Sequence, residues 1–160
     1  MTAEDAAPAW LPGRRLGVDV GTVRVGVAVS DATGMLASPL VTLRRAKGQS
    51  DLDRLAELVV TEEVVEVVVG LPKHLSGASG ASARDASAYA EALASRIGEV
   101  PVHLVDERLS TVTAASHLRA GGITARHQRS VIDQAAAVVI LQSHLDGRSR
   151  TGPGDQGRHS

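Results

Sequence analysis

The chain has 160 residues, of which 43% are hydrophobic and 22% are charged, and its formal net charge is -1 at pH 7. This balance is typical of one globular domain that buries a core, and it excludes a disordered chain and a protein held on nucleic acid by a global basic field. The chain has no cysteine, one Trp and one Tyr, which excludes disulfides, thiolate metal sites and an aromatic surface for base stacking.

Residues 1–13 contain Ala, Pro, Gly and acidic side chains without periodicity, and are predicted to form a flexible N-terminal arm. The arm lacks a basic segment followed by an apolar one, so we expect no signal peptide. The longest apolar runs of the chain are too short to cross a bilayer. We therefore expect a cytoplasmic protein without a membrane partner.

Three strands are predicted after the arm, over residues 16–20, 25–30 and 36–43. The first two are β-branched runs joined by a tight turn, in which Gly21 permits the sharp change of direction. Pro39 predicts that the third strand lies at an edge of the sheet or contains a bulge.

A helix is predicted next, with Ser50 as its N-cap. Its apolar face consists of Leu52, Leu55, Leu58 and Val59. Residues 64–69 are β-branched apart from Glu66, which predicts a strand buried on both faces, as in a parallel sheet. Residues 73–80 are mostly small or polar, and are predicted to form a flexible loop at the C-terminal end of this strand.

Helix and strand alternate in the second half of the chain. We predict helices over residues 82–97 and 111–120, with a strand over residues 100–105 between them. The last helix is predicted over residues 130–146, and its central run is apolar nearly all round, so we expect it to be buried.

The order of these elements predicts one α/β domain over residues 14–146, with a mixed central sheet flanked by helices. Residues 147–160 are mostly Gly, Ser, Arg and Pro, and are predicted to form a disordered tail. In such sheets, sites form beyond the C-terminal ends of the parallel strands.

Asp19 stands inside the first apolar strand, where a carboxylate is costly to bury unless a metal ion or a cation compensates its charge. Gly26 in the second strand leaves room for the close approach of another group. Two further acids stand at element ends: Glu107 follows the 100–105 strand, and Asp133 lies in the predicted first turn of the last helix. If the first strand and the strand before Glu107 are neighbours, the last helix can bring Asp133 over the other two acids.

Three clustered carboxylates repel one another, so at neutral pH they need divalent cations or shifted pKa values. Hard oxygen ligands favour Mg²⁺ or Mn²⁺. Two such ions about 3.5–4 Å apart can stabilise the attacking and the leaving oxygen in the hydrolysis of a phosphodiester bond. We therefore predict that Asp19, Glu107 and Asp133 are the catalytic residues and the ligands of two ions.

Each of these acids also has a structural interpretation. Asp19 could bond the backbone of the turn that follows it. Glu107 could pair with Arg108 or cap the next helix, and Asp133 could complement the helix dipole. Asp106 could replace Glu107 or hold the turn, but alternation along the strand directs these two side chains to opposite faces, so only one of them can face the ions.

Basic side chains near the predicted site are candidates for contacts with phosphates, and scattered surface cations are the alternative interpretation for each of them. Arg24 is the strongest candidate, because its turn lies beside Asp19; Lys73 and Arg108 are the other predicted substrate-binding residues. The other basic candidates near the predicted site are Arg84, Arg126, Arg129, His74 and His127. The two histidines lack the paired spacing of metal ligands.

Four blocks follow one another along the sequence: DVGTVRVGVAVSD (residues 19–31), VGLP (69–72), VDERLST (105–111), and DQAA with ILQS (133–136 and 140–143). Together they resemble the YqgF (RuvX) family, whose members are described as pre-16S rRNA nucleases and as Holliday-junction-resolvase-like proteins. The resemblance extends over residues 14–146. The chain departs from the family pattern at His74 and Ser76, where an Asn and an acidic residue are usual, and at Gln134, where Lys is usual.

The resemblance implies a ribonuclease H-like fold and a metal-dependent nuclease in which Asp19, Glu107 and Asp133 hold Mg²⁺ or Mn²⁺. We expect endonucleolytic hydrolysis that leaves 5′-phosphate and 3′-hydroxyl ends, in the processing of the 5′ end of pre-16S rRNA. The alternative substrate is branched DNA. A junction resolvase would need two active sites and hence a homodimer, so both a monomer and a homodimer stay open.

Two other classes of function compete with a nuclease. The segment Asp19–Thr22 also resembles the phosphate loop of ATP-dependent sugar kinases and actin-like ATPases, but those proteins need two such domains, and 160 residues supply one. A non-catalytic nucleic-acid-binding assembly factor would keep the fold, would still bind after loss of Asp19, and would cleave nothing with either ion.

Overall fold

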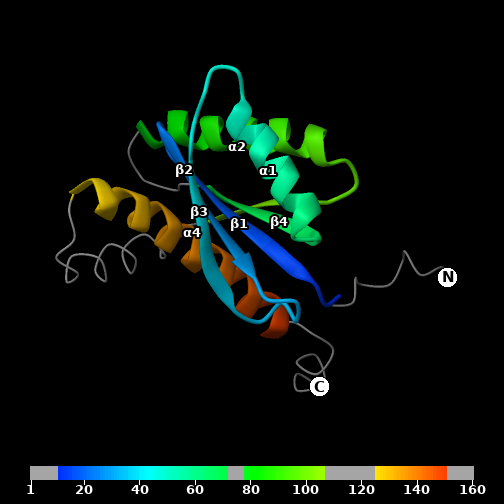
Figure 1. Cartoon of the computed structure of the whole chain (residues 1–160). Coiled ribbons are helices and arrows are strands. Elements are labelled where there is room, and N and C mark those ends of the chain that lie inside the picture. The colour runs from blue at the N-terminus through cyan, green and yellow to red at the C-terminus, as the bar shows by residue number, and fades with distance from the viewer. Residues whose placement is uncertain (1–10, 72–77, 107–124, 151–160) are drawn as a thin grey trace.

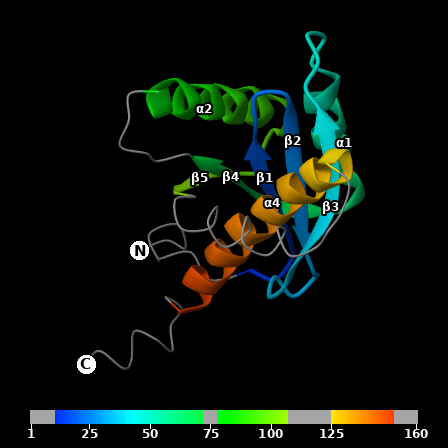
Figure 2. The ribbon, with the colours of Figure 1, turned by 90° about the vertical axis from the view of Figure 1, so that its left-hand side faces the viewer.

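The centre of the protein is a five-stranded mixed sheet with helices on both faces (Figures 1 and 2). The computed structural model describes residues 11–71, 78–106 and 125–150. The strands lie in the order β3-β2-β1-β4-β5. Their bounds are Arg14–Val20 (β1), Arg24–Ser30 (β2), Ala37–Arg44 (β3), Val64–Leu71 (β4) and Val102–Asp106 (β5).

The first three strands form an antiparallel meander, whereas β1, β4 and β5 run parallel. The β1–β2 turn is tight, because the Gly21 amide donates a hydrogen bond of 2.9 Å to the Arg24 carbonyl. Two helices make the crossovers that parallel strands require, α1 (Ser50–Thr61) and α2 (Ala78–Ile97). β3 is an edge strand, and its register against β2 shifts between Val27 and Ala28, beside Pro39, which confirms the prediction from that proline.

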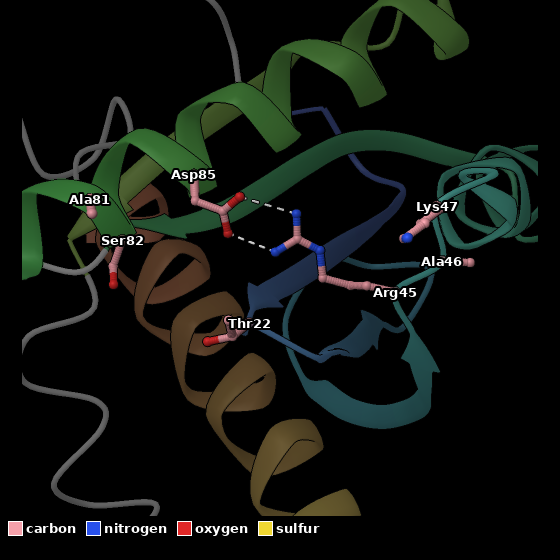
Figure 3. A pocket seen from close by; sticks show the side chains of 7 residues that line it. All are labelled: Thr22, Arg45, Ala46, Lys47, Ala81, Ser82 and Asp85. Carbon is pink, nitrogen blue, oxygen red and sulfur yellow. Dashed lines mark hydrogen bonds and ion pairs between the residues drawn. The ribbon is translucent and has the colours of Figure 1, made fainter.

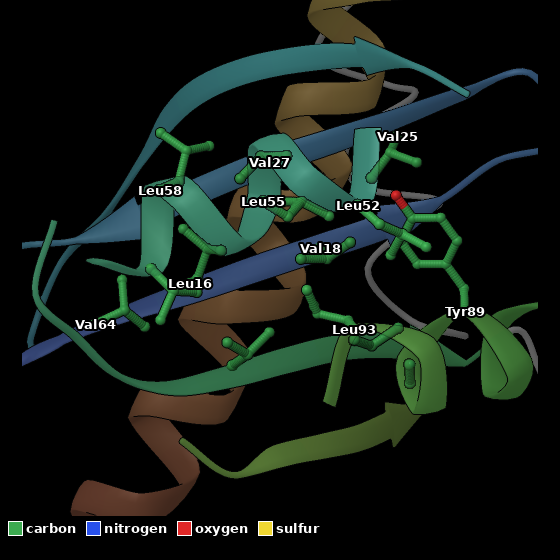
Figure 4. Packing of buried hydrophobic residues seen from close by; sticks show 14 of the residues in the cluster. Leu16, Val18, Val25, Val27, Leu52, Leu55, Leu58, Val64, Tyr89 and Leu93 are labelled. Atoms are coloured by element: carbon green, nitrogen blue, oxygen red, sulfur yellow. The ribbon is translucent and has the colours of Figure 1, made fainter. Parts of the chain in front are cut away.

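The two faces of the sheet carry separate cores. Helices α1 and α2 cover one face, where Leu55 and Leu93 pack on Val18 and its neighbours (Figure 4). Helix α4 (Ala125–Arg150) covers the other face and buries Ile140 against the sheet. The residues predicted to face the core from α1 are all buried: Leu52, Leu55, Leu58 and Val59. No helix within the described ranges is both long and apolar enough to span a bilayer.

The predicted α/β class and mixed sheet are confirmed, but several element boundaries were wrong. Ser50 is the first residue of α1 rather than its cap; the cap is Gln49, in a left-handed conformation without a side-chain hydrogen bond. Residues 78–80 belong to α2 and not to a loop. In β4, Glu66 is buried while Val65 is exposed, so burial on both faces is incomplete. The predicted helix at 111–120 and residues 73–77 of the predicted loop lie outside the described residues.

The last helix is longer than predicted, and this changes the interpretation of Asp133. α4 begins at Ala125, roughly two turns before Asp133, and it continues to Arg150. Asp133 is therefore not in the first turn, and complementing the helix dipole does not explain an acid at this position, because that effect is confined to the first turn.

Candidate active site

Asp19 lies on the face of the sheet that α4 covers. Side chains alternate along a strand, so Asp19 shares a face with Gly17. A Cβ atom on Gly17 would lie 2.7 Å from Cβ of Leu141 and 2.9 Å from the carbonyl oxygen of Ala137, both in α4. The acid in β1 therefore points toward the helix and away from the core that α1 and α2 form.

Gly26 brings Asp133 to the same place. Asp19 pairs directly with Gly26 in the antiparallel ladder, so the two positions share a face of the sheet. A Cβ on Gly26 would lie 1.9 Å from the carbonyl oxygen of Asp133, which means that only a glycine lets α4 come so close. Asp19 and Asp133 are thus neighbours in space, and the predicted role of Gly26 in close approach is confirmed.

Arg24 is bound to Asp133. Its Nε donates a hydrogen bond of 2.8 Å to Oδ2 of Asp133, and the two side chains are 31% and 18% exposed. Arg24 was predicted beside Asp19 from its position in the turn, and the ion pair that the structure shows joins Arg24 to Asp133 in α4, the acid next to Asp19. A half-buried carboxylate in this position is stabilised by the guanidinium.

The structure does not test the remaining members of the predicted catalytic and substrate-binding sets. Glu107, Lys73 and Arg108 lie outside the described residues. β1 and β5 are not neighbours, contrary to the condition under which the three acids were expected to converge, because β4 lies between them. Val105 near the end of β5 packs against the apolar cluster that α4 forms with the sheet. Within the described ranges, no group of three or more His, Cys, Asp or Glu side chains could hold a metal ion.

A pocket of about 530 Å³ opens between the β1–β2 turn, the segment after β3 and the start of α2 (Figure 3). Arg45 crosses it and forms two hydrogen bonds with Asp85, of 2.6 and 3.1 Å. The same guanidinium donates a hydrogen bond of 2.9 Å to the carbonyl of Gly21, two residues after Asp19. Hydrogen bonding to Asp85 raises the pKa of Arg45 above its already high value.

Tyr89 supports this pair from the core side. Arg45 lies 5.1 Å from the centroid of the Tyr89 ring, whose hydroxyl donates a hydrogen bond of 2.7 Å to Asp51. Asp51 also accepts a hydrogen bond from the backbone of Ala46. Burial, with the hydrogen bond to Asp51, raises the pKa of Tyr89 far above its ordinary value. Sequence reasoning missed this network, because its members come from four separate segments and no local spacing marks them.

The strand order β3-β2-β1-β4-β5 and the position of Asp19 beneath α4 place the protein in the ribonuclease H-like class. Among solved structures, RuvC of T. thermophilus in complex with a Holliday junction substrate is similar, with a TM-score of 0.54 and 17% identity. The match covers 87% of this chain and 97% of that one. At this identity, the similarity establishes the fold alone.

The sequence comparisons are more specific. The family model RuvX, described as Holliday junction resolvase, matches residues 13–147, and the chain belongs to this family. A protein of Mycobacterium leprae (strain Br4923) named "Putative pre-16S rRNA nuclease" is 63% identical over 134 residues, covering 84% of this chain and 73% of the relative. A protein of Mycobacteroides abscessus with the same name is 57% identical over 141 residues, covering 88% and 85%.

Proposed function

We propose that this protein is a metal-dependent endonuclease that hydrolyses phosphodiester bonds, and that it processes the 5′ end of pre-16S rRNA. The observation that carries the proposal is the convergence of Asp19 and Asp133 at Gly26, from opposite ends of the chain. Two acids on one face of the sheet need a positive partner, and Arg24 supplies one charge. The names of the mycobacterial relatives support rRNA as the substrate.

Asp19, Glu107 and Asp133 are the proposed catalytic residues and metal ligands. Glu107 is included for its place in the sequence: it follows β5, two positions after Val105, which packs on the face covered by α4. Carboxylate oxygens fit Mg²⁺ or Mn²⁺. When bound, two such ions would stabilise the attacking and leaving oxygens of the phosphodiester.

Arg24 has two roles in this proposal. Through Nε it fixes the orientation of Asp133, which a ligand carboxylate needs. Its two terminal nitrogens make no hydrogen bond to the described residues, and we assign them to a phosphate of the substrate. Lys73 and Arg108 are proposed as further contacts with the nucleic-acid backbone.

A Holliday-junction resolvase is the second candidate, favoured by the description of the family model. It differs from an rRNA nuclease in substrate and in assembly, since cutting a junction needs two active sites and hence a homodimer. If the protein is found to be a monomer in solution, that result favours cleavage of rRNA, which needs one active site, over resolution of a junction. A non-catalytic assembly factor is the third candidate. In all three cases the partner is nucleic acid, and we propose a cytoplasmic location.

The test compares cleavage of a 5′-extended pre-16S fragment and of a four-way DNA junction, each with Mn²⁺ or Mg²⁺. We expect cleavage by the wild type and none by Asp19→Asn, Glu107→Gln or Asp133→Asn. The matched control is Asp53→Asn, which removes an exposed carboxylate on α1 that pairs with Arg96. Equal cleavage by all four variants would reject the site. Tight binding without cleavage by the wild type would favour the assembly factor.

A further inference from the structure

The pocket beside the β1–β2 turn lies next to the proposed active site, yet neither Asp19 nor Asp133 lines it. Thr22 lines it, and Thr22 lies only three positions after Asp19 in the chain. Even a fully extended chain of that length spans at most about 11 Å. The pocket is therefore close enough to Asp19 for a second phosphate of the same strand to reach it.

The lining favours an anion. Lys47 forms no ion pair with any described residue, whereas the charge of Asp85 is matched by the two hydrogen bonds from Arg45. One positive charge thus remains in the pocket. It can attract an anionic ligand because Asp85, the one carboxylate among the described lining residues, is already bound by Arg45.

Hydroxyl groups face the same space. Thr22 and Ser82 line the pocket at the turn and at α2, and neither hydroxyl bonds to another described residue (Figure 3). The first turn of α2 carries no acidic side chain that would repel an anion from this end of the helix. None of the described residues that line the pocket carries an aromatic ring on which a base could stack. Two hydroxyl donors and an ammonium group suit the oxygens of a phosphate.

The walls of the pocket are fixed before any ligand binds. Arg45 joins the carbonyl of Gly21 in the turn to Asp85 in α2, and it rests on the ring of Tyr89. Both hydroxyl-bearing elements are thereby held at a set separation. Preorganised donors lose little entropy when a ligand binds.

We propose that this pocket, formed by Thr22, Lys47 and Ser82 around the Arg45–Asp85 pair, binds one backbone phosphate of the substrate strand at a fixed distance from the cleaved bond. The inference rests on the proposed nucleic-acid function. It assigns to Lys47 the role of setting which phosphate lies at the acids.

The test measures binding in EDTA with an Asp19→Asn background, so that no cleavage is needed. A series of strands is prepared in which a single methylphosphonate linkage, which removes one phosphate charge, occupies each position in turn. We expect Lys47→Ala to weaken binding about fivefold and to lower the salt slope by about one. At one linkage only, the loss of binding free energy caused by the methylphosphonate and the loss caused by Lys47→Ala should not be additive. Ser82→Ala and Thr22→Val should show the same linkage.

The matched control is Arg54→Ala, which removes an exposed cation on α1 that pairs with Glu57. Additive losses at every linkage, or a Lys47→Ala affinity equal to that of Arg54→Ala, would overturn the subsite. Inorganic phosphate alone provides a separate arm: saturation of the pocket by free phosphate that the strand does not compete for would also overturn it. If the linkage is found and the wild type with Mn²⁺ cleaves nothing, the nuclease proposal fails while the phosphate subsite remains.

Discussion

The carbonyl oxygen of Asp133 lies where the Cβ of any residue other than glycine at position 26 would be, 1.9 Å from that ideal atom. Helix α4 therefore rests with its backbone on β2, directly across the ladder from Asp19. The separation of the two acids is set by this contact, and not by the side chains around it. A single methyl group is enough to change it.

Gly26→Ala should displace α4 and lower both stability and activity. A methyl group cannot fit against the α4 backbone, so we expect a loss of about 1–3 kcal/mol in the free energy of unfolding. Cleavage should fall more steeply than stability, since the acids separate. Urea unfolding and cleavage rates check the two effects. Gly48→Ala is the control, because a Cβ there meets no atom within 4 Å; equal behaviour of the two variants would contradict the close packing.

Arg24→Gln should lower activity without unfolding the protein. The substitution removes the charged partner of Asp133 but keeps a polar side chain of similar reach. We expect a loss of about 10- to 100-fold in kcat/KM, as for other partners of metal-ligating carboxylates. The Mn²⁺ concentration for half-maximal cleavage should rise as well. Arg54→Gln, on the surface of α1, is the control, and an unchanged Mn²⁺ requirement in Arg24→Gln would argue against its orienting role.

Features that depend on residues close together in the sequence could be predicted. The β-branched runs, the apolar face of α1 and the proline in β3 each act within a few residues, and all three predictions were confirmed. Asp19 and Gly26 stood out as exceptions inside such runs, and they do lie together in the site. The predictions of two helix ends were wrong: Ser50 is not the cap of α1, and α4 begins at Ala125, well before Asp133.

Long-range polar contacts could not be predicted. Glu66 was visible as the single polar residue in a β-branched run, but nothing in its neighbourhood indicated that it is buried with Arg15. Arg45 and Asp85 are likewise 40 positions apart. Pairs of this kind depend on the strand order and on helix docking, and a single sequence does not reveal either one directly.

Glu66→Ala should be among the most destabilising substitutions in the protein. Both Arg15 and Glu66 are almost fully buried and lie 3.2 Å apart, and Glu66 also faces His103 at 3.0 Å and His144 at 3.2 Å. Removing the carboxylate leaves the buried guanidinium without this partner, at a cost of about 3–5 kcal/mol. Urea unfolding gives the measurement. Glu57→Ala, which breaks an exposed pair with Arg54, should cost about 0–1 kcal/mol.

A double variant separates charge burial from packing at the same position. Replacing both members by apolar residues of similar volume, as in Arg15→Met with Glu66→Leu, should recover much of the stability lost in Glu66→Ala, because the buried guanidinium is removed together with the carboxylate that it binds. Equal stability of Glu66→Ala and the double variant would mean that the remaining guanidinium costs little and that the loss comes from packing.

Asp31 should make the β2–β3 turn sensitive to acid. Its carboxylate accepts hydrogen bonds from Thr33 Oγ1 and from the backbone amides of Met35 and Leu36, and these bonds lower its pKa from 3.8 to about 2. A lowered pKa means that the charged form is favoured in the folded state, so the contribution is complete above the unfolded value and is lost as the pH falls toward 2. The stability difference between the wild type and Asp31→Asn should therefore be constant above pH about 5 and shrink below pH about 4. Carboxyl NMR titration of the wild type and of Thr33→Val provides the direct check: the valine variant should titrate at higher pH, and a wild-type midpoint near 3.8 would contradict the hydrogen-bonded turn.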